Sequence, residues 1–402
     1  MANILFIYPR KMVTIEDMHN IFNSEVAKKF DFNARFETVW TVKKNVLDWA
    51  DVLVFVRNLD LISQWFLKKA QKKGYFIIQF FDDDLLGLPR SAVNRVQFLK
   101  WRKKAVKSGF ENTNVILSSN LMLAQKYAKM IPSGRFSIMD TMVSKQALIP
   151  LEKIERNKDN QKVKIVFAAG ANHEKVFNDY IAPVIPLLAK ECKKQLSFTF
   201  FGVHPELSMS VKNVEVEYIG AMPLLEYRKK IQEGKYDIGL APLEHNDFTQ
   251  YKYFNKFIEY TIAGTSAIYS KVPPYTLVIE DGKNGFFAEN TTESWFKVLK
   301  TVIENDDLRN NTYKNAYNHI LQNMNPEAIF KKLYIDIPEL SEHNAEKKAF
   351  SIIFLKIKFF FFRILEFFYL IFEYLRITGI KGTVKKVIDY QKDKSTAKKE
   401  KL

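Results

Sequence analysis

The feature that most limits the fold of this chain is a regular alternation between short apolar runs and longer segments with helical periodicity. In the first part of the chain, apolar runs of strand length occupy residues 4–8, 36–42, 52–56, 75–81, 115–117 and 136–139. A second series occupies residues 163–169, 196–201, 214–219, 237–243 and 266–270. Strands that alternate with helices form parallel sheets covered by helices. The sequence therefore predicts an α/β protein with two doubly wound domains.

The length and the composition agree with two domains. A chain of 402 residues with 47% apolar composition can bury two ordinary cores. We expect a first domain at 1–145, a polar linker at 146–162, a second domain at 163–340 and a separate segment at 341–402. The single cysteine, Cys192, excludes an intramolecular disulfide and fits a reducing compartment. The first eight residues are too short and lack the basic flank of a signal peptide, so we expect a cytoplasmic protein.

The most informative stretch is 236–285, which reads as strand, polar loop, helix and strand. In open parallel sheets, ligands bind beyond the carboxyl ends of the strands. Lys252, Lys256 and Glu259 lie in the loop and the first turns of the helix. A helix start with lysines suits a phosphate, and a carboxylate accepts hydrogen bonds from sugar hydroxyls. The combination predicts a site for a nucleotide or a nucleotide-sugar.

These residues also belong to an ordered series that ends with Pro274, 278–282 and Gly285. The series resembles the donor-binding half of GT-B glycosyltransferases, and it is most similar to the large retaining family that uses nucleotide-sugars. The resemblance covers residues 163–320 well and the N-terminal half more loosely. Many members carry two glutamates eight positions apart, and the earlier position here is Tyr251. This sequence instead resembles a subgroup with paired lysines before the second glutamate.

The resemblance implies two Rossmann-like domains that face a cleft, with the donor bound between them. It implies that Lys252 and Lys256 stabilise the leaving diphosphate, and that Glu259 holds the ribose of the nucleotide. It implies no cofactor and no bound metal.

A second loop, directly after the predicted strand 163–169, approaches the donor phosphates in the enzymes that the chain resembles. Gly170 is the expected position of close backbone approach. Asn172 and His173 are expected beside the sugar or the diphosphate. A solvent-exposed His173 is the alternative, because a lone histidine in a loop is usually solvated.

Three consecutive acids, Asp82, Asp83 and Asp84, follow a predicted strand of the first domain, again at a carboxyl end. Three interpretations are open: a divalent-metal site, an acceptor-facing base with hydroxyl-binding carboxylates, and a solvated helix cap. Similar acidic stretches occur in GT-B enzymes of surface-polysaccharide type, which work without a bound metal. We therefore assign Asp83 a catalytic role and Asp82 and Asp84 to substrate binding. Arg57 faces the same edge and is expected to be solvated.

The C-terminal segment has a different character. Between residues 350 and 376, the charged residues Lys356, Arg363, Glu366 and Glu373 share one face of a helix. The opposite face is apolar and consists of Ile353, Ile357, Phe360, Ile364, Phe367, Phe368, Ile371 and Leu375. No run of 18 residues is free of charge, which argues against a membrane span.

A lysine-rich end follows this helix, and residues 341–402 hold 14 Lys or Arg against seven Asp or Glu, +7 of the net charge of +16. A large apolar face with a basic tail suits a helix that lies on an anionic membrane surface. The alternatives are a helix packed on the protein itself and a dimer contact.

The resemblance implies a retaining glycosyltransferase of cell-surface polysaccharide synthesis, and the C-terminal helix predicts that it is peripheral on the inner face of the membrane. The expected donor is a nucleotide-sugar, and the expected acceptor is a glycan or a lipid-linked glycan. A catalytically inactive scaffold that binds a nucleotide-sugar is the second hypothesis, based on the missing first glutamate. A basic nucleic-acid-binding protein is the third, and the helical-core spacing of the tail aromatics disfavours it.

Overall fold

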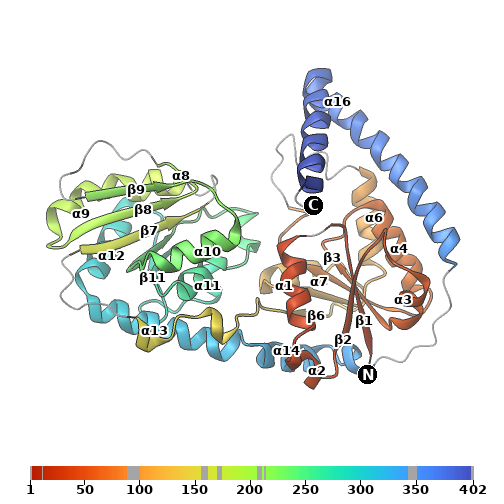
Figure 1. The fold of residues 1–402 in the computed structure, drawn as a ribbon, viewed down its shortest axis with the longest axis horizontal. Coiled ribbons are helices and arrows are strands. Elements are labelled where there is room, and N and C mark those ends of the chain that lie inside the picture. The colour runs from red at the N-terminus through yellow and green to blue at the C-terminus, as the bar shows by residue number, and fades with distance from the viewer. Residues whose placement is uncertain are drawn as a thin grey trace. The chain divides into compact units, whose positions relative to one another are not determined.

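The structure is a computed structural model that describes residues 2–10, 12–87, 100–154, 162–169, 174–205, 211, 214–342 and 351–399. The chain forms two compact units (Figure 1). Unit 1 comprises residues 1–139 and 330–402, and unit 2 comprises residues 140–329.

Unit 1 contains a six-stranded sheet in the order β2-β1-β3-β4-β5-β6. Every neighbouring pair is parallel. Its strands are β1 (Asn3–Tyr8), β2 (Asn33–Thr38), β3 (Val52–Val56), β4 (Phe76–Phe81), β5 (Val115–Ser118) and β6 (Phe136–Ile138). The described helices between them are α1 (Val13–Phe22), α2 (Glu25–Lys29), α3 (Lys44–Trp49), α4 (Leu61–Gln71), α6 (Lys100–Phe110) and α7 (Leu121–Ala128).

Alternate residues of these strands supply the two faces of the sheet. Leu5 and Ile7 belong to one apolar cluster, which also contains side chains of α3 and α4. Phe6 points the other way, and its ring centroid lies 4.7 Å from that of Phe22 on α1. Because both faces are covered, the strands are apolar almost throughout, as the sequence pattern indicated.

The strand predicted at 36–42 is wrong by three residues at its start and by four at its end, because β2 covers Asn33–Thr38. The pairing of Phe6 with Phe36 sets the register of β2 against β1. Val39 and Val42 lie after the strand and pack into the core from the connection to α3. Their burial explains why they resembled strand residues.

Unit 2 contains a second six-stranded parallel sheet, in the order β12-β11-β10-β7-β8-β9. Its strands are β7 (Lys162–Ala168), β8 (Gln195–Phe201), β9 (Val214–Ile219), β10 (Ile238–Ala241), β11 (Ser266–Ser270) and β12 (Phe286–Ala288). Its main helices are α8 (Glu174–Val176), α9 (Ile185–Glu191), α10 (Leu224–Glu233), α11 (Asn255–Ile262), α12 (Thr292–Glu304) and α13 (Asp306–Asn323). Two parallel sheets flanked by helices confirm the predicted α/β class.

Between β7 and β8, the chain forms a series of short helical turns rather than one continuous helix. A π-helical turn (Phe177–Ile181) and a 3₁₀ turn (Ala182–Val184) separate α8 from α9. Pro183 and Pro186 lie in this stretch, and proline removes a backbone donor from a regular helix.

The chain returns to unit 1 through α14 (Pro326–Asp336) and α15 (Glu339–Glu342). Phe330 is fully buried, with its ring centroid 5.3 Å from that of Phe22. Arg135 donates to both carboxylate oxygens of Glu339, at 2.6 and 3.0 Å. These contacts fix the start of the C-terminal segment on unit 1.

The last described helix, α16 (Ile352–Lys399), consists of two helical parts separated at Gly379. Gly379 has φ of +67°, a left-handed conformation that glycine adopts without strain. Figure 1 shows the chain reversing direction within α16.

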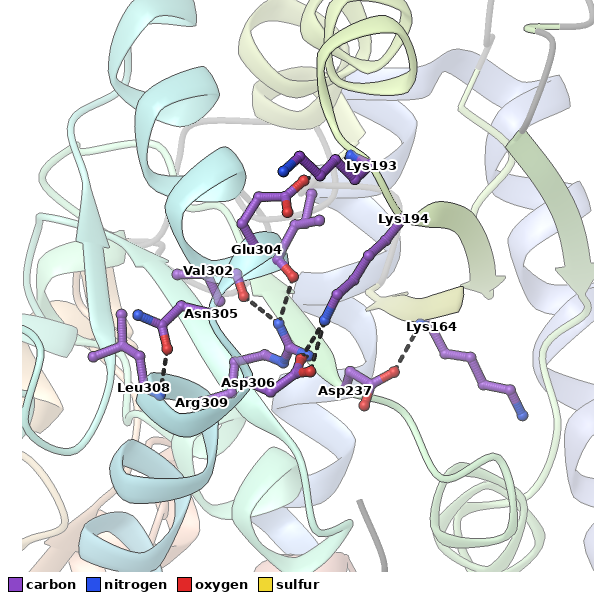
Figure 2. A network of polar contacts seen from close by, with 11 residues as sticks. Lys164, Lys193, Lys194, Asp237, Val302, Glu304, Asn305, Asp306, Leu308 and Arg309 are labelled. Carbon is purple, nitrogen blue, oxygen red and sulfur yellow. Dashed lines mark hydrogen bonds and ion pairs between the residues drawn. The ribbon is translucent and has the colours of Figure 1, made fainter. Parts of the chain in front are cut away.

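A buried arginine fixes the junction between α12 and α13 (Figure 2). Arg309 is 4% exposed, and it donates to the backbone carbonyls of Val302 and Ile303 and to the carboxylate of Asp306. Lys194 binds the same carboxylate at 2.6 and 2.7 Å. Lys194 directly precedes β8, so this network lies at the amino edge of the sheet and stabilises the fold there.

Candidate functional site

The carboxyl edge of the unit 2 sheet, around the start of α11, is the first part of the candidate site. Strands β10 and β11 are parallel neighbours, and α11 connects them. Gly239 on β10 lies directly under the ring of Tyr260, where an added Cβ atom would be 2.7 Å from the ring. The hydroxyl of Tyr260 donates to the carbonyl of Leu240 at 2.7 Å. These contacts fix α11 against the sheet and thereby fix the helix start.

Lys256 and Glu259 form an ion pair on the first turns of α11, with Nζ and Oε2 2.5 Å apart. Their side chains are 20% and 29% exposed, so solvent and ligands can reach both. The Lys256 ammonium also lies 5.8 Å from the ring centroid of Tyr227. The residue before the helix, Phe254, has no polar side-chain atom that could cap it. The helix start thus presents peptide N–H groups beside a lysine, an arrangement that attracts anions.

Tyr227, on α10, is a site residue that the sequence analysis did not identify. Its hydroxyl donates to Oε2 of Glu259 at 3.1 Å. Burial and the nearby Glu259 carboxylate raise the pKa of Tyr227, so the hydroxyl stays protonated and remains a donor. No local pattern in the sequence indicates this pair, because Tyr227 and Glu259 are 32 residues apart and meet only through packing.

Lys252 lies just before α11, after a 3₁₀ turn at Thr249–Tyr251. Its ammonium is 5.6 Å from the ring centroid of Phe248. The two predicted lysines therefore contact different neighbours: Lys252 contacts an aromatic ring of the loop, and Lys256 contacts the carboxylate of Glu259.

The second predicted donor loop follows β7. Gly170, Asn172 and His173 lie outside the described residues. Ala169, the last described residue before them, donates its backbone N–H to the carbonyl of Phe201 at 3.2 Å. Gly202 has φ of +72°, and an added Cβ atom would lie 3.0 Å from the carbonyl oxygen of Ala169. The ends of β7 and β8 are therefore neighbours, at the same carboxyl edge of the sheet from which the chain leads into α11.

The carboxyl edge of the unit 1 sheet carries the acid run. Nε of Arg57 lies 3.2 Å from Oδ1 of Asp82, and a terminal nitrogen lies 3.2 Å from Oδ2 of Asp83. Thr14, on α1, donates to Oδ2 of Asp82 at 2.7 Å. The expectation that Arg57 is solvated is wrong: its side chain is 25% exposed and binds two carboxylates. Asp82 and Asp83 themselves remain partly exposed, at 20% and 36%.

Asp84 has a different environment from its two neighbours. Its side chain is fully buried, with Lys126 Nζ 2.7 Å from Oδ2 and the Tyr127 hydroxyl 2.8 Å from Oδ1. The same hydroxyl accepts the backbone N–H of Leu86 at 3.2 Å. An added Cβ atom on Gly87 would lie 1.9 Å from Oδ2 of Asp84. Asp84 thus fixes the loop that carries Asp82 and Asp83.

Within the described residues, no group of three or more His, Cys, Asp or Glu side chains is arranged to hold a metal ion.

No protein-family model and no curated protein sequence matches the chain. Solved structures do match. HepE of Anabaena in complex with UDP and glucose has 10% sequence identity, a TM-score of 0.54, and coverage of 84% of this chain and 100% of that one. Sucrose-phosphate synthase from Thermosynechococcus elongatus has 11% identity and a TM-score of 0.56, over 85% of this chain and 99% of that one. The lipopolysaccharide outer core galactosyltransferase WaaB has 13% identity and a TM-score of 0.52, over 84% and 99%.

The chain has the GT-B fold. This result confirms the fold that the resemblance implied, and it agrees with the two parallel sheets described above.

Proposed function

We propose that this protein is a glycosyltransferase that moves a sugar from a nucleotide-sugar to a glycan or lipid-linked acceptor, with retention of configuration. The observation that carries the proposal is the half-buried Lys256–Glu259 pair at the start of α11, at the carboxyl edge of a parallel sheet. This pair offers a cation for a phosphate and a carboxylate for sugar hydroxyls. The fold likeness supports the proposal, since HepE has been solved with UDP-glucose.

In the proposed mechanism, the donor diphosphate lies at the start of α11. Negative charge develops on the diphosphate as the bond to the sugar breaks, and Lys252 and Lys256 stabilise that charge. Preorganised charges of this kind are usually the largest contribution to such a step. Glu259, oriented by Tyr227, accepts hydrogen bonds from the ribose hydroxyls.

The remaining proposed roles concern the sugar and the acceptor. Gly170 and Asn172 contact the donor phosphates through their loop, and His173 contacts the sugar or the diphosphate. On unit 1, Asp83 acts on the acceptor hydroxyl and Asp82 binds the acceptor. Asp84 supports acceptor binding by fixing their loop, because both of its carboxylate oxygens already have protein partners.

Donor binding can be tested with a thermal-shift assay of the purified protein against UDP and UDP-glucose. A ligand that binds only the folded state raises the melting temperature. The Lys256→Ala variant should lose most of that shift. Lys283→Ala is the matched control, because Lys283 also pairs with a glutamate three positions away, Glu280, but on an exposed surface. Equal shifts in the two variants would remove Lys256 from the donor site.

A nucleotide-sugar-binding scaffold without transferase activity is the second candidate, because Tyr251 stands where many similar enzymes carry a glutamate. A donor-hydrolysis assay separates the two candidates. Slow release of UDP that Lys256→Ala abolishes supports the enzyme, and donor binding without any hydrolysis or transfer supports the scaffold.

The proposed location is the inner face of the cytoplasmic membrane, with the segment 350–402 as the contact. In the part of the chain that the structure describes, no helix has the length and apolarity needed to cross a bilayer.

A further inference from the structure

The first part of α16 packs on unit 1 through a narrow face. Leu355 and Phe359 are each 2% exposed and belong to the apolar cluster under α3 and α4. The ring of Phe359 lies 5.7 Å from that of Phe66, on α4, and 6.2 Å from that of Trp65. This contact holds the helix on the domain and determines which of its faces points outward.

The direction of α16 along unit 1 follows from two contacts with α4. Phe359 meets Phe66, in the second turn of α4, whereas Glu366 accepts the backbone N–H of Leu61, the first residue of α4, at 3.2 Å. The helix α16 therefore runs antiparallel to α4 and toward the carboxyl edge of the sheet, where β3 leads into α4. Arg57, Asp82 and Asp83 lie at this edge. The part of α16 beyond Glu366 extends past it (Figure 1).

The outward face of α16 is apolar and exposed. Its members are each between 40% and 66% exposed: Ile357, Phe360, Phe361, Ile364, Phe367, Phe368, Phe372 and Leu375. At 100° per residue these positions cover roughly 140° of the helix circumference. Beyond Gly379, a second apolar stripe of exposed residues continues with Ile380, Val384 and Ile388.

Basic residues border this face on both sides. By helical position, Lys356 and Arg363 lie along one border, and Lys358 and Arg376 lie along the other. The acidic residue Glu366 lies on the opposite side of the helix, where it accepts the backbone N–H of Leu61 on α4. In a dimer formed through this face, the basic residues along the borders of one copy would lie against those of the other copy and repel them. An anionic lipid surface accepts both the apolar side chains and the borders.

We propose that the outward face of α16 lies in the headgroup region of an anionic bilayer, with the carboxyl edge of the unit 1 sheet turned toward the lipid. Four of the eight apolar positions follow Glu366 and therefore lie beyond the start of α4, so the edge that carries Asp82 and Asp83 is nearer to the bilayer than the opposite edge. An acceptor carried on a membrane lipid would then reach this edge without leaving the bilayer. The acceptor class rests on the proposed function, whereas the orientation does not.

The first test measures binding of the full chain to vesicles, with Phe368→Glu as the variant. Phe368 is 64% exposed, so the substitution leaves the fold intact. Ile335→Glu is the matched control, because Ile335 is 66% exposed and lies on α14. We expect binding to phosphatidylglycerol vesicles over phosphatidylcholine vesicles, a decrease of at least about tenfold for Phe368→Glu, and no change for Ile335→Glu. Equal binding by all three proteins, or self-association without vesicles that only Phe368→Glu abolishes, would overturn the proposal.

The second test measures orientation. A fluorophore is attached to Arg10→Cys, at the carboxyl edge after β1, or to Lys72→Cys, at the amino edge before β4. Both positions are exposed, and the native Cys192 is buried. Brominated phosphatidylglycerol vesicles should quench the label at position 10 more strongly than the label at position 72. Equal or reversed quenching would refute the orientation. Neither test needs a donor or turnover, so failure here is distinct from failure of the proposed function.

Discussion

The carboxyl edges of the two sheets both carry charged side chains, but these side chains differ in their burial and in their partners. In unit 1, the buried carboxylate of Asp84 has Lys126 and Tyr127 as partners, and Arg57 binds both Asp82 and Asp83. In unit 2, Lys256 and Glu259 pair with each other and stay partly exposed.

The difference shows that topology fixes where charged residues gather, while burial decides whether they serve the fold or a ligand. A buried charge that loses its partner destabilises the fold strongly, whereas an exposed pair contributes little to stability. The edge in unit 1 therefore contains a structural acid, Asp84, beside the partly exposed Asp82 and Asp83, whereas the Lys256–Glu259 pair at the edge in unit 2 is partly exposed in both its members.

The largest expected effect is on the stability of unit 1. Asp84→Asn should lower the free energy of unfolding by about 2–3 kcal/mol, because the amide loses two charge-assisted hydrogen bonds and its NH₂ group opposes a buried donor. Chemical denaturation measures this change. Asp83→Asn, at a site 36% exposed, should cost less than about 1 kcal/mol. An equal loss of unfolding free energy in the two variants would contradict the assignment of Asp84 as the structural acid.

The second effect is on turnover rather than stability. Lys256→Ala should lower the transfer or hydrolysis rate by more than about tenfold, which corresponds to ~1.4 kcal/mol of barrier. Its free energy of unfolding should change by less than about 1 kcal/mol, because the ion pair is local and partly exposed. Kinetic assays and denaturation of the same preparation check both parts. A large loss of stability with unchanged turnover would assign the lysine to the fold.

A smaller effect is expected for the positioning residue Tyr227. Tyr227→Phe removes the hydrogen bond to Glu259, which should weaken UDP-sugar affinity by about twofold to tenfold. Isothermal titration calorimetry measures the affinity. Tyr75→Phe is the control, because it removes a hydrogen bond to the carbonyl of Leu47 in unit 1. If Tyr75→Phe weakened donor binding as much as Tyr227→Phe does, the loss of affinity could not be assigned to the hydrogen bond with Glu259.

The smallest effect is a pH dependence in unit 2. Burial lowers the pKa of His319, whose ring meets that of Phe257 on α11. The unfolded chain then binds a proton more readily, so this contribution to stability is complete above the unfolded pKa of about 6.5 and declines as pH falls through it. Melting temperatures between neutral and mildly acidic pH should fall less for His319→Gln than for the native chain. Identical pH profiles would exclude His319 as the cause.

Much of this organisation could be predicted from local sequence. The runs at 52–56 and 266–270 coincide with β3 and β11, since strands covered on both faces need continuous apolar residues. The segment between β7 and β8 is harder to predict, since two prolines break a pattern whose periodicity is otherwise helical.

The sequence by itself determined the two parallel sheets, the polar edges that follow their strands, and the amphipathic character of the C-terminal helix. These properties depend on residues that are neighbours in the chain. Only the tertiary structure decided that Asp84 is buried while Asp83 is partly exposed, that Tyr227 binds Glu259, and that Leu355, Phe359 and Glu366 form the face of α16 that packs on unit 1. The reason is physical: each outcome depends on a partner far away in sequence, as Leu61 is from Glu366, and only packing brings the two together.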